Sequence, residues 1–314
     1  MILVTGATGF VGRHAVRALL AAGHRVRVCT RRDPSGLPAD VETARIADVA
    51  EVDWSGPLRD AHCVLHIAGK AHTDPRGDTG KQAEFRRVNV QATVALARAA
   101  INAGTRRLVL VSSIGVNGSC TQGHPFTEAD APAPTDFYAV TKFEAEEHVR
   151  SVCGGSSMEV VIVRPALVAG AGAPGSLARL AGAVRARAPL PFSAIHNQRS
   201  LVGVRSLAAL LELCCRHPAA AGRLFLAADS PPLSSAEIIS EIAAGLAVRP
   251  MLLSVPVTLL KAIAAVLGRS REVSRLCDSL VVSSETAQTL LGWHAEVPIR
   301  DELRELGAAA RTDA

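Results

Sequence analysis

Short apolar runs and helical patterns alternate along the first half of the chain. The runs are four to six residues long and rich in Val, Ile and Leu, at residues 2–5, 25–30, 63–67, 108–111 and 160–163. Continuous apolar runs of this length are typical of strands buried on both faces. Between the first two runs, Val16, Leu19 and Leu20 share one face of a helical segment that Gly23 ends. The alternation predicts an α/β fold with a doubly wound parallel sheet.

The pattern loosens after Pro165. Helical spacing predicts helices at residues 176–187, 206–217, 235–246, 256–267, 284–291 and 299–310, and a strand at 224–227. We therefore expect a larger domain of residues 1–165 and a smaller, mainly helical lobe of residues 166–314, with strands exchanged between them. The apolar stretch 251–267 contains Pro256 and Lys261 and is short for a membrane span. We expect it to form a buried helix, with a membrane-surface helix as the alternative.

The composition of the 314-residue chain narrows its partners. The net charge is +5, but the basic residues are dispersed and aromatic residues make up only 3%. This pattern argues against a nucleic-acid partner and fits an anionic small molecule. The seven cysteines form no CxxC pair and no metal-like spacing, so we expect reduced, buried thiols and no metal. Because the chain starts on an apolar strand without a basic leader, we expect a cytoplasmic protein without an integral membrane segment.

A glycine-rich turn follows the first apolar run directly and precedes an amphipathic helix. Gly6, Gly9 and Gly12 have the spacing that permits a tight turn and a close approach of backbone to ligand. The N-terminus of the following helix offers free N–H groups to a pyrophosphate. The turn therefore predicts a Rossmann-type dinucleotide site. Its expected contacts are Gly6, Thr8, Gly9, Phe10, Val11 and Gly12.

The end of the second strand indicates which dinucleotide binds. An acidic residue there would favour NAD, but this chain has Thr30, Arg31 and Arg32. Two guanidinium groups could hold a 2′-phosphate, so NADP(H) is favoured and NAD(H) is the alternative. A solvated surface pair is the simpler interpretation of the two arginines. The remaining expected cofactor contacts are Asp48, as an acceptor for the adenine amino group, and Val49, Ala68, Gly69 and Pro165.

Tyr138 and Lys142 are four residues apart, which places them on one face of a helix. A free tyrosine has a pKa near 10, and a neighbouring ammonium lowers it, so the pair can serve as a general acid or base. Ser113, at the end of the fifth run, could orient the same substrate oxygen. Each residue alone has an ordinary structural explanation. Their joint occurrence around the only tyrosine of the chain favours carbonyl chemistry.

These motifs resemble the extended short-chain dehydrogenase/reductases, specifically the NAD-dependent epimerase/dehydratase group that acts on nucleotide sugars. The resemblance spans the chain and is carried by residues 5–12, 65–69, 88–90, 111–113, 138–142 and 164–165, which read TGATGFVG, LHIAG, VNV, VSS, YAVTK and RP. It implies that Ser113, Tyr138 and Lys142 are catalytic and that Asn89 supports the site. It also implies that the carboxyl lobe binds a nucleoside diphosphate sugar and that Tyr138 and Lys142 contact the cofactor.

Departures from the family pattern limit which of the family's reactions we expect this chain to catalyse. Sugar-nucleotide dehydratases carry Thr-Asp-Glu where this chain has Ser-Ile-Gly at 113–115, which disfavours dehydration. Many UDP-hexose 4-epimerases carry Val-Tyr-Gly where this chain has Val-Asn-Gly at 116–118 and Val-Ala-Gly at 168–170. Both changes disfavour a standard epimerase pocket. Residues 197–204 resemble a subgroup from bacterial surface-polysaccharide (O-antigen) biosynthesis, which contains 4-ketoreductases and 4-epimerases.

The resemblance also suggests substrate contacts. Arg199 matches the family position that contacts the diphosphate, and Asn117 and Ser113 are expected at the sugar. Arg275 is a second candidate, and a solvated helix charge explains it about as well. We expect reduction of a UDP-4-keto-6-deoxy-N-acetylhexosamine. The alternatives are a UDP-hexose or UDP-N-acetylhexosamine 4-epimerase, a reductase of a non-sugar ketone, and a non-catalytic cofactor sensor. A homodimer is left open.

Overall fold

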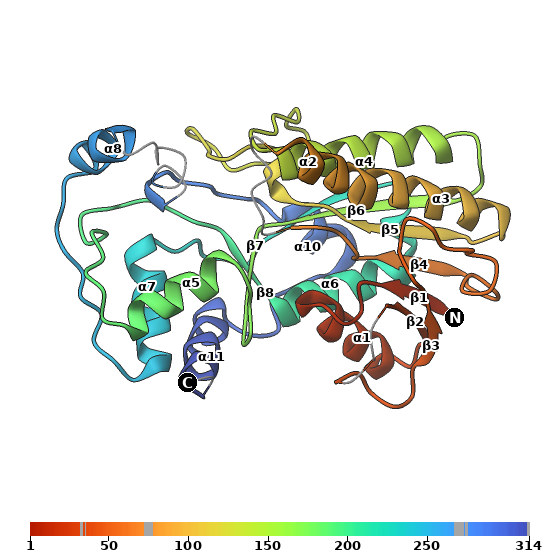
Figure 1. The fold of residues 1–314 in the computed structure, drawn as a ribbon, viewed down its shortest axis with the longest axis horizontal. Helices are drawn as coiled ribbons and strands as arrows, with labels where there is room; N and C mark the ends of the chain where they lie inside the picture. The colour runs from red at the N-terminus through yellow and green to blue at the C-terminus, as the bar shows by residue number, and fades with distance from the viewer. Residues whose placement is uncertain (32–33, 35, 72–77, 267–272, 274–275, 313–314) are drawn as a thin grey trace.

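Seven parallel strands form the centre of the molecule (Figure 1). The computed structural model describes residues 1–31, 34, 36–71, 78–266, 273 and 276–312. The strands lie in the order β3-β2-β1-β4-β5-β6-β9. Their bounds are β1 Ile2–Thr5, β2 Val26–Thr30, β3 Glu42–Arg45, β4 Cys63–His66, β5 Arg107–Val111, β6 Glu159–Pro165 and β9 Leu224–Ala227. The order reverses between β1 and β4, as in a doubly wound sheet, so the predicted fold class is confirmed.

Helices cover both faces of this sheet because successive side chains of each strand point to opposite sides. Ile2 and Val4 pack with α1 Phe10–Ala21 and α6 Val204–Arg216 on one face. Leu3 packs on the other face, with α3 Ala92–Asn102 and α4 Phe137–Cys153. The continuous apolar runs in the sequence therefore reflect burial on two sides. The remaining helices of this body are α2 Thr79–Arg86, the π-helix η1 Arg87–Gln91, the 3₁₀ helices η2 Ile114–Val116 and η3 Pro218–Ala220, and α10 Glu285–Leu291.

A second core lies beyond the carboxyl end of β6, to the left in Figure 1. It contains the two-stranded parallel sheet β7 Leu167–Ala169 and β8 Leu201–Gly203, and the helices α5 Ser176–Arg185, α7 Ser235–Leu246 and α11 Ile299–Thr312. Helices α7 and α11 approach closely because each has a glycine at their contact, Gly245 in α7 and Gly307 in α11. A Cβ at Gly245 would lie 2.0 Å from the Arg304 carbonyl oxygen. Residues after 165 also return to the main sheet, where they form α6 and β9.

The apolar segment expected to be a buried helix forms α8 Val257–Val266, at the upper left of Figure 1. Val257 and Leu260 pack against the second core, but Leu259 is 50% exposed, as is Met251. The prediction of a buried helix is wrong for the face that carries Leu259. Apolar composition favours burial, but it does not say whether the chain provides a surface to cover every face. In the described part of the chain, no helix is both long and apolar enough to cross a membrane.

Candidate active site

The glycine-rich turn connects β1 to α1 at the carboxyl edge of the sheet. Gly6 has φ +74°, and a Cβ there would lie 2.6 Å from the backbone nitrogen of Ala68. A Cβ at Gly12 would lie 2.1 Å from the carbonyl oxygen of Gly6. Gly9 is the N-cap of α1 and provides no side-chain cap, so the first N–H groups of the helix have no side-chain partner there. The turn thus fits the pyrophosphate of a dinucleotide. Thr8, Phe10 and Val11 line the same turn and are partly exposed.

The residues expected around the adenosine lie beyond β2 and β3. Thr30 is buried and Arg31 is exposed, while Arg32 lies outside the described residues. Asp48 forms an ion pair with Arg87 at 2.7 Å and accepts a hydrogen bond from the Ala50 backbone nitrogen at 3.0 Å. Hydrogen bonding to Arg87 is the main reason that the pKa of Asp48 is lowered. Its carboxylate therefore already has partners in the protein. Val49 is buried in the core beside α3.

The catalytic candidates lie where β5 ends and α4 begins. Ser113 is the N-cap of η2, and its Oγ accepts a hydrogen bond from the Gly115 backbone nitrogen at 3.2 Å. A Cβ at Gly115 would touch the Cβ of Ala139 at 3.2 Å, so η2 packs directly against the first turn of α4, which contains Tyr138. The Asp136 side chain caps this helix by accepting from the Ala139 nitrogen at 2.8 Å. Ser113 and Tyr138 both remain partly exposed.

Lys142 lies one turn further along α4 and is 2% exposed. A Cβ at Gly69 would lie 3.8 Å from the Lys142 Nζ and 3.3 Å from Asn89 Oδ1, so these three residues meet at the end of β4. Burial lowers the pKa of Lys142 to about 8, and the Glu146 carboxylate opposes this effect. Pro165, the last residue of β6, is buried at the same edge of the sheet.

The acidity of Tyr138 differs from the sequence-based expectation. We expected the ammonium of Lys142 to lower the pKa of the phenol. In the protein alone, burial raises the pKa of Tyr138 to about 12, and the nearby charge of Asp136 adds to the rise. Desolvation of the phenolate is the main cause of this rise, and Lys142 is not among its causes. Tyr138 is therefore protonated at neutral pH and is suited to donate a proton.

Asn89 lies in the π-helix η1 and is fully buried. Its Oδ1 accepts from the Lys70 backbone nitrogen at 2.7 Å, and its Nδ2 donates to Thr141 Oγ1 at 3.0 Å. Thr141 in turn donates to the carbonyl oxygen of Tyr138 at 2.8 Å. Asn89 therefore fixes the loop after β4 to the first turn of α4. A π-bulge of this kind often marks a functional site.

A chain of hydrogen bonds joins Asn89 to the glycine-rich turn. Thr93 Oγ1 donates to the Asn89 carbonyl at 2.7 Å and lies 2.9 Å from His66 Nε2, while His66 Nδ1 lies 2.7 Å from Thr5 Oγ1. Burial lowers the pKa of His66 to about 3, so its ring is neutral and has one donor and one acceptor nitrogen. His66 belongs to the LHIAG motif at residues 65–69, but the sequence alone predicts no role for it. Its position on an otherwise apolar strand was the available signal.

The expected substrate contacts lie further out. Asn117 is 2% exposed; its Oδ1 accepts from Arg164 at 2.9 Å and its Nδ2 donates to the Thr127 carbonyl at 3.3 Å. Its amide is thus engaged inside the protein, which differs from the expected direct contact with the sugar. The Arg199 guanidinium donates to the Asp278 carbonyl oxygen at 3.2 Å. Arg275 lies outside the described residues.

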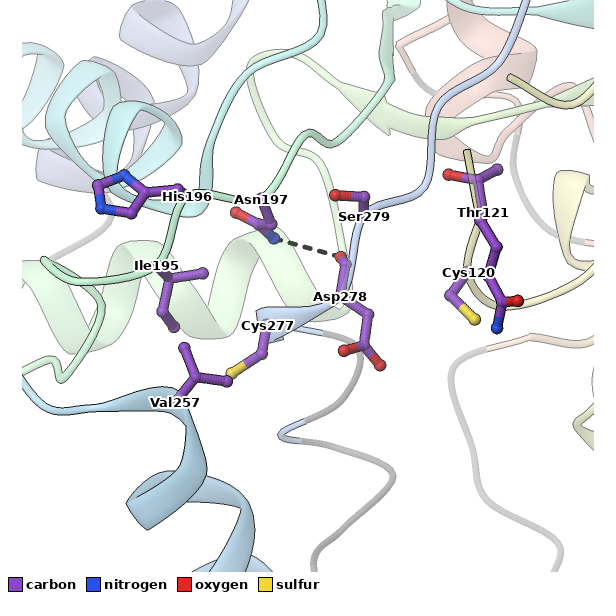
Figure 2. A pocket seen from close by; sticks show the side chains of 10 residues that line it. Cys120, Thr121, Ile195, His196, Asn197, Val257, Cys277, Asp278 and Ser279 are labelled. Carbon is purple, nitrogen blue, oxygen red and sulfur yellow. Dashed lines mark hydrogen bonds between the residues drawn. The ribbon is translucent and has the colours of Figure 1, made fainter. Parts of the chain in front are cut away.

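A pocket of about 500 Å³ lies against the second core and is lined in part by Asp278, whose carbonyl oxygen accepts from Arg199 (Figure 2). Its walls include Thr121, His196, Asn197, Asp278 and Ser279. Asn197 donates to the Asp278 carbonyl at 3.3 Å and so joins two of these wall segments. Hydroxyl, amide and carboxylate groups around an open cavity suit a polar ligand. Across the described residues, no three His, Cys, Asp or Glu side chains are grouped as a metal site requires.

The chain is similar to known proteins in both sequence and fold. The sequence profile of the NAD dependent epimerase/dehydratase family matches residues 2–227. A UDP-glucose 4-epimerase from Vibrio cholerae is 36% identical over 312 residues, which are 98% of this chain and 94% of that protein. A dihydroflavonol 4-reductase from Zea mays is 30% identical and covers 71% of this chain and 68% of its own. The solved structure of MoeE5 in complex with UDP-glucose and NAD has a TM-score of 0.79 at 26% identity and covers 99% of both chains.

Proposed function

The chain belongs to the NAD-dependent epimerase/dehydratase family, and we propose that it catalyses oxidation–reduction at C4 of a nucleotide-activated sugar. The observation that carries the proposal is the packing of η2, capped by Ser113, against the turn of α4 that contains Tyr138, with Lys142 buried one turn further on. A protonated phenol, a hydroxyl and an ammonium at one edge of a dinucleotide-binding sheet are the groups that carbonyl reduction requires.

In the proposed reaction the phenol of Tyr138 donates its proton to the C4 oxygen of a keto sugar. Its pKa, raised to about 12, keeps that proton in place until the oxygen gains charge. Ser113 Oγ donates a hydrogen bond to the same oxygen and orients the carbonyl. Lys142 provides a positive charge beside the developing phenolate. A bound nicotinamide dinucleotide supplies the hydride, and most of the rate gain comes from orienting the reacting groups.

We propose NADP(H) as the preferred cofactor. Arg31 is exposed directly after β2, at the edge where the adenosine ribose of a dinucleotide binds. We expect Arg31→Ala to weaken NADPH binding by about tenfold while NADH binding changes little, since a lost charge-assisted phosphate contact costs about 1.5 kcal/mol. Arg106→Ala is the matched control, because Arg106 is 72% exposed and precedes β5 at the opposite edge of the sheet. Equal affinities of the unaltered protein for NADPH and NADH would refute this part of the proposal.

For the substrate we propose a UDP-4-keto-6-deoxy-N-acetylhexosamine. The Arg199 guanidinium favours a phosphate-bearing ligand over an apolar ketone, because Arg is suited to charge-assisted hydrogen bonds with phosphate. The solved MoeE5 complex contains UDP-glucose, which supports a UDP-linked sugar. The segment 113–115 reads Ser-Ile-Gly and offers no carboxylates for dehydration. A net reductase exchanges its cofactor at every turnover, which fits a preference for NADPH.

Epimerisation at C4 is the second candidate. The UDP-glucose 4-epimerase from Vibrio cholerae resembles the chain over 98% of its length, which favours this reaction. An epimerase uses the same three groups, but it oxidises and reduces one sugar and needs no external reductant. The fate of the cofactor therefore separates the two reactions.

The test incubates the protein with UDP-4-keto-6-deoxy-N-acetylglucosamine plus NADPH, and separately with UDP-N-acetylglucosamine without added cofactor. If NADPH absorbance falls in the first reaction and the second reaction gives no product, the protein is a reductase. Conversion to UDP-N-acetylgalactosamine in the second supports the epimerase. In either case Tyr138→Phe should lower turnover by about 10²–10⁴-fold and leave cofactor binding intact. Retention of full activity by this variant would refute the catalytic assignment.

A further inference from the structure

A buried cluster of charged and polar side chains lies under the catalytic helix. Glu146 of α4 is 0% exposed and Arg164 of β6 is 1% exposed. Their side chains form a two-point ion pair, with Arg164 Nε 3.0 Å from Glu146 Oε1 and Nη2 2.6 Å from Oε2. Ser112 Oγ donates to Glu146 Oε1, and Arg164 Nη1 donates to Asn117 Oδ1 at 2.9 Å. The ion pair thus joins α4 to β6, and its two further hydrogen bonds, to Ser112 and Asn117, connect it to the residue after β5 and to the end of η2.

Three of these residues lie close in sequence to candidate catalytic groups, and the fourth, Arg164, directly precedes Pro165, an expected cofactor contact. Ser112 directly follows β5 and directly precedes Ser113. Asn117 is the C-cap of η2, the short helix that Ser113 begins. Glu146 follows Lys142 by four residues, on the same face of α4. A two-point ion pair with satisfied hydrogen bonds holds its elements in one relative position, because any shift leaves a charge buried and unpaired.

We propose that Glu146 and Arg164 are positioning residues for the reaction: their ion pair aligns α4 with the ends of β5 and β6 and holds a negative charge one turn from Lys142. The inference rests on the catalytic roles proposed above for Ser113, Tyr138 and Lys142. It assigns a function to two charges that are buried inside the protein.

Few other described groups near Lys142 carry a charge that could affect its protonation. On α4 it faces Tyr138, which is protonated, and Glu146. From β4 it faces His66, which burial keeps neutral. Asn89 of η1 lies nearby and has no charge. Among the described residues, Glu146 is the negative charge that favours the protonated lysine against burial, and Arg164 from β6 is its ion-pair partner.

The test compares Glu146→Gln with the double variant Glu146→Gln/Arg164→Met. The single variant keeps the side-chain shape but leaves the Arg164 charge unbalanced, whereas the double variant removes both charges. Glu147→Gln is the matched control, because Glu147 is the next residue of α4, is exposed and forms a surface pair with Arg150 at 3.5 Å. The chain has only four lysines, so ¹³C-lysine NMR can follow Lys142 directly in the full-length protein, with Lys142→Met to assign its signal.

We expect the pKa of Lys142 to fall by about one pH unit or more in Glu146→Gln and to recover only in part in the double variant, because removal of the Arg164 charge does not restore the Glu146 charge. The alkaline limb of kcat should move in parallel. Both variants should lose about tenfold or more in kcat with a smaller change in KM, because alignment is lost while substrate contacts remain. Glu147→Gln should match the wild type in every measurement.

An unchanged pKa of Lys142 in Glu146→Gln would overturn the electrostatic half of the inference. Wild-type kcat in the double variant would overturn the alignment half, even where the single variant fails to fold. The NMR titration needs no substrate, so it remains decisive when the substrate is another carbonyl compound. Full activity of Tyr138→Phe would refute the proposed function and leave the NMR result standing.

Discussion

Lys142→Met should destroy activity and at the same time stabilise the fold. Lys142 is 2% exposed, and burial lowers its pKa from 10.5 to about 8. The difference of 10.5 − 8 = 2.5 corresponds, at about 1.36 kcal/mol per pKa unit, to about 3 kcal/mol of unfavourable free energy for holding the protonated lysine in the fold. Methionine has a similar length and no charge, so it removes this cost and buries an apolar chain. The variant should therefore gain up to about 3 kcal/mol in free energy of unfolding at pH 7.

The gain should depend on pH in a defined direction. Between pH 8 and pH 10.5 the lysine is neutral in the fold and protonated in the unfolded chain, so the unfolded state binds more protons. The free energy of unfolding of the wild type therefore rises with pH through that window as Lys142 loses its proton. Below pH 8 the buried lysine is protonated and its full destabilising effect is present. The advantage of the variant should be about 3 kcal/mol at pH 7 and about 1 kcal/mol at pH 9.5.

Urea denaturation of both proteins at the two pH values measures these differences, and other groups titrate equally in both. Lys81→Met is the control, because the Lys81 side chain is 55% exposed and its ion pair with Asp78, at 3.0 Å, lies at the surface; it should change the free energy of unfolding by less than about 0.5 kcal/mol. A variant that is less stable than the wild type at pH 7, or a gain that is equal at both pH values, would refute the reasoning.

Three other perturbations test separate parts of the structure. Gly12→Ala should weaken dinucleotide binding by about tenfold or more, measured by fluorescence of the reduced cofactor, because its Cβ would lie 2.1 Å from the Gly6 carbonyl oxygen; unchanged affinity would contradict the placement of the turn. Wild-type stability should fall by about 1.4 kcal/mol per pH unit below pH 6.5 through His66, since its folded pKa is about 3 and the unfolded state takes up the proton first; His66→Gln should show a smaller slope in acid denaturation. Leu259→Ser should change the thermal midpoint little, because Leu259 is 50% exposed, and a large loss would mean that α8 packs elsewhere.

The fold could be predicted where local sequence carries the physical cause. Strands buried on both faces are mostly apolar, so β1 and β5 can be recognised in the sequence as nearly continuous apolar runs. The edge strand β3 is mostly exposed, and its sequence Glu-Thr-Ala-Arg carries no such signal. Strands β7 and β8 have three residues each, too few for a pattern. Their existence depends on pairing between distant segments, which periodicity does not report.

The candidate site was predictable where spacing along one element decides it. Gly6 to Gly12 and Tyr138 to Lys142 are local patterns, and the structure places each pair as the spacing requires. What the sequence could not indicate was burial. The expected effect of Lys142 on Tyr138 followed from charge alone, but desolvation reverses the sign of the shift. A glutamate on a helix is usually solvated, so the sequence does not indicate that Glu146 is buried. The structure shows that Glu146 forms a buried ion pair with Arg164 of β6.

Tyr138, Lys142 and Glu146 form one stripe along α4, with a spacing of four residues. In the described part of the chain, Lys142 has no ion-pair partner, whereas Glu146 is paired with Arg164. Substitutions of these two residues should therefore change the free energy of unfolding in opposite directions. Lys142→Met removes an unpaired charge and should raise the free energy of unfolding, whereas Glu146→Gln leaves the Arg164 charge uncompensated and should lower it by about 3–5 kcal/mol. Denaturation of both variants at pH 7 measures the contrast. Two changes of the same sign would mean that packing, and not charge, governs this face of the helix.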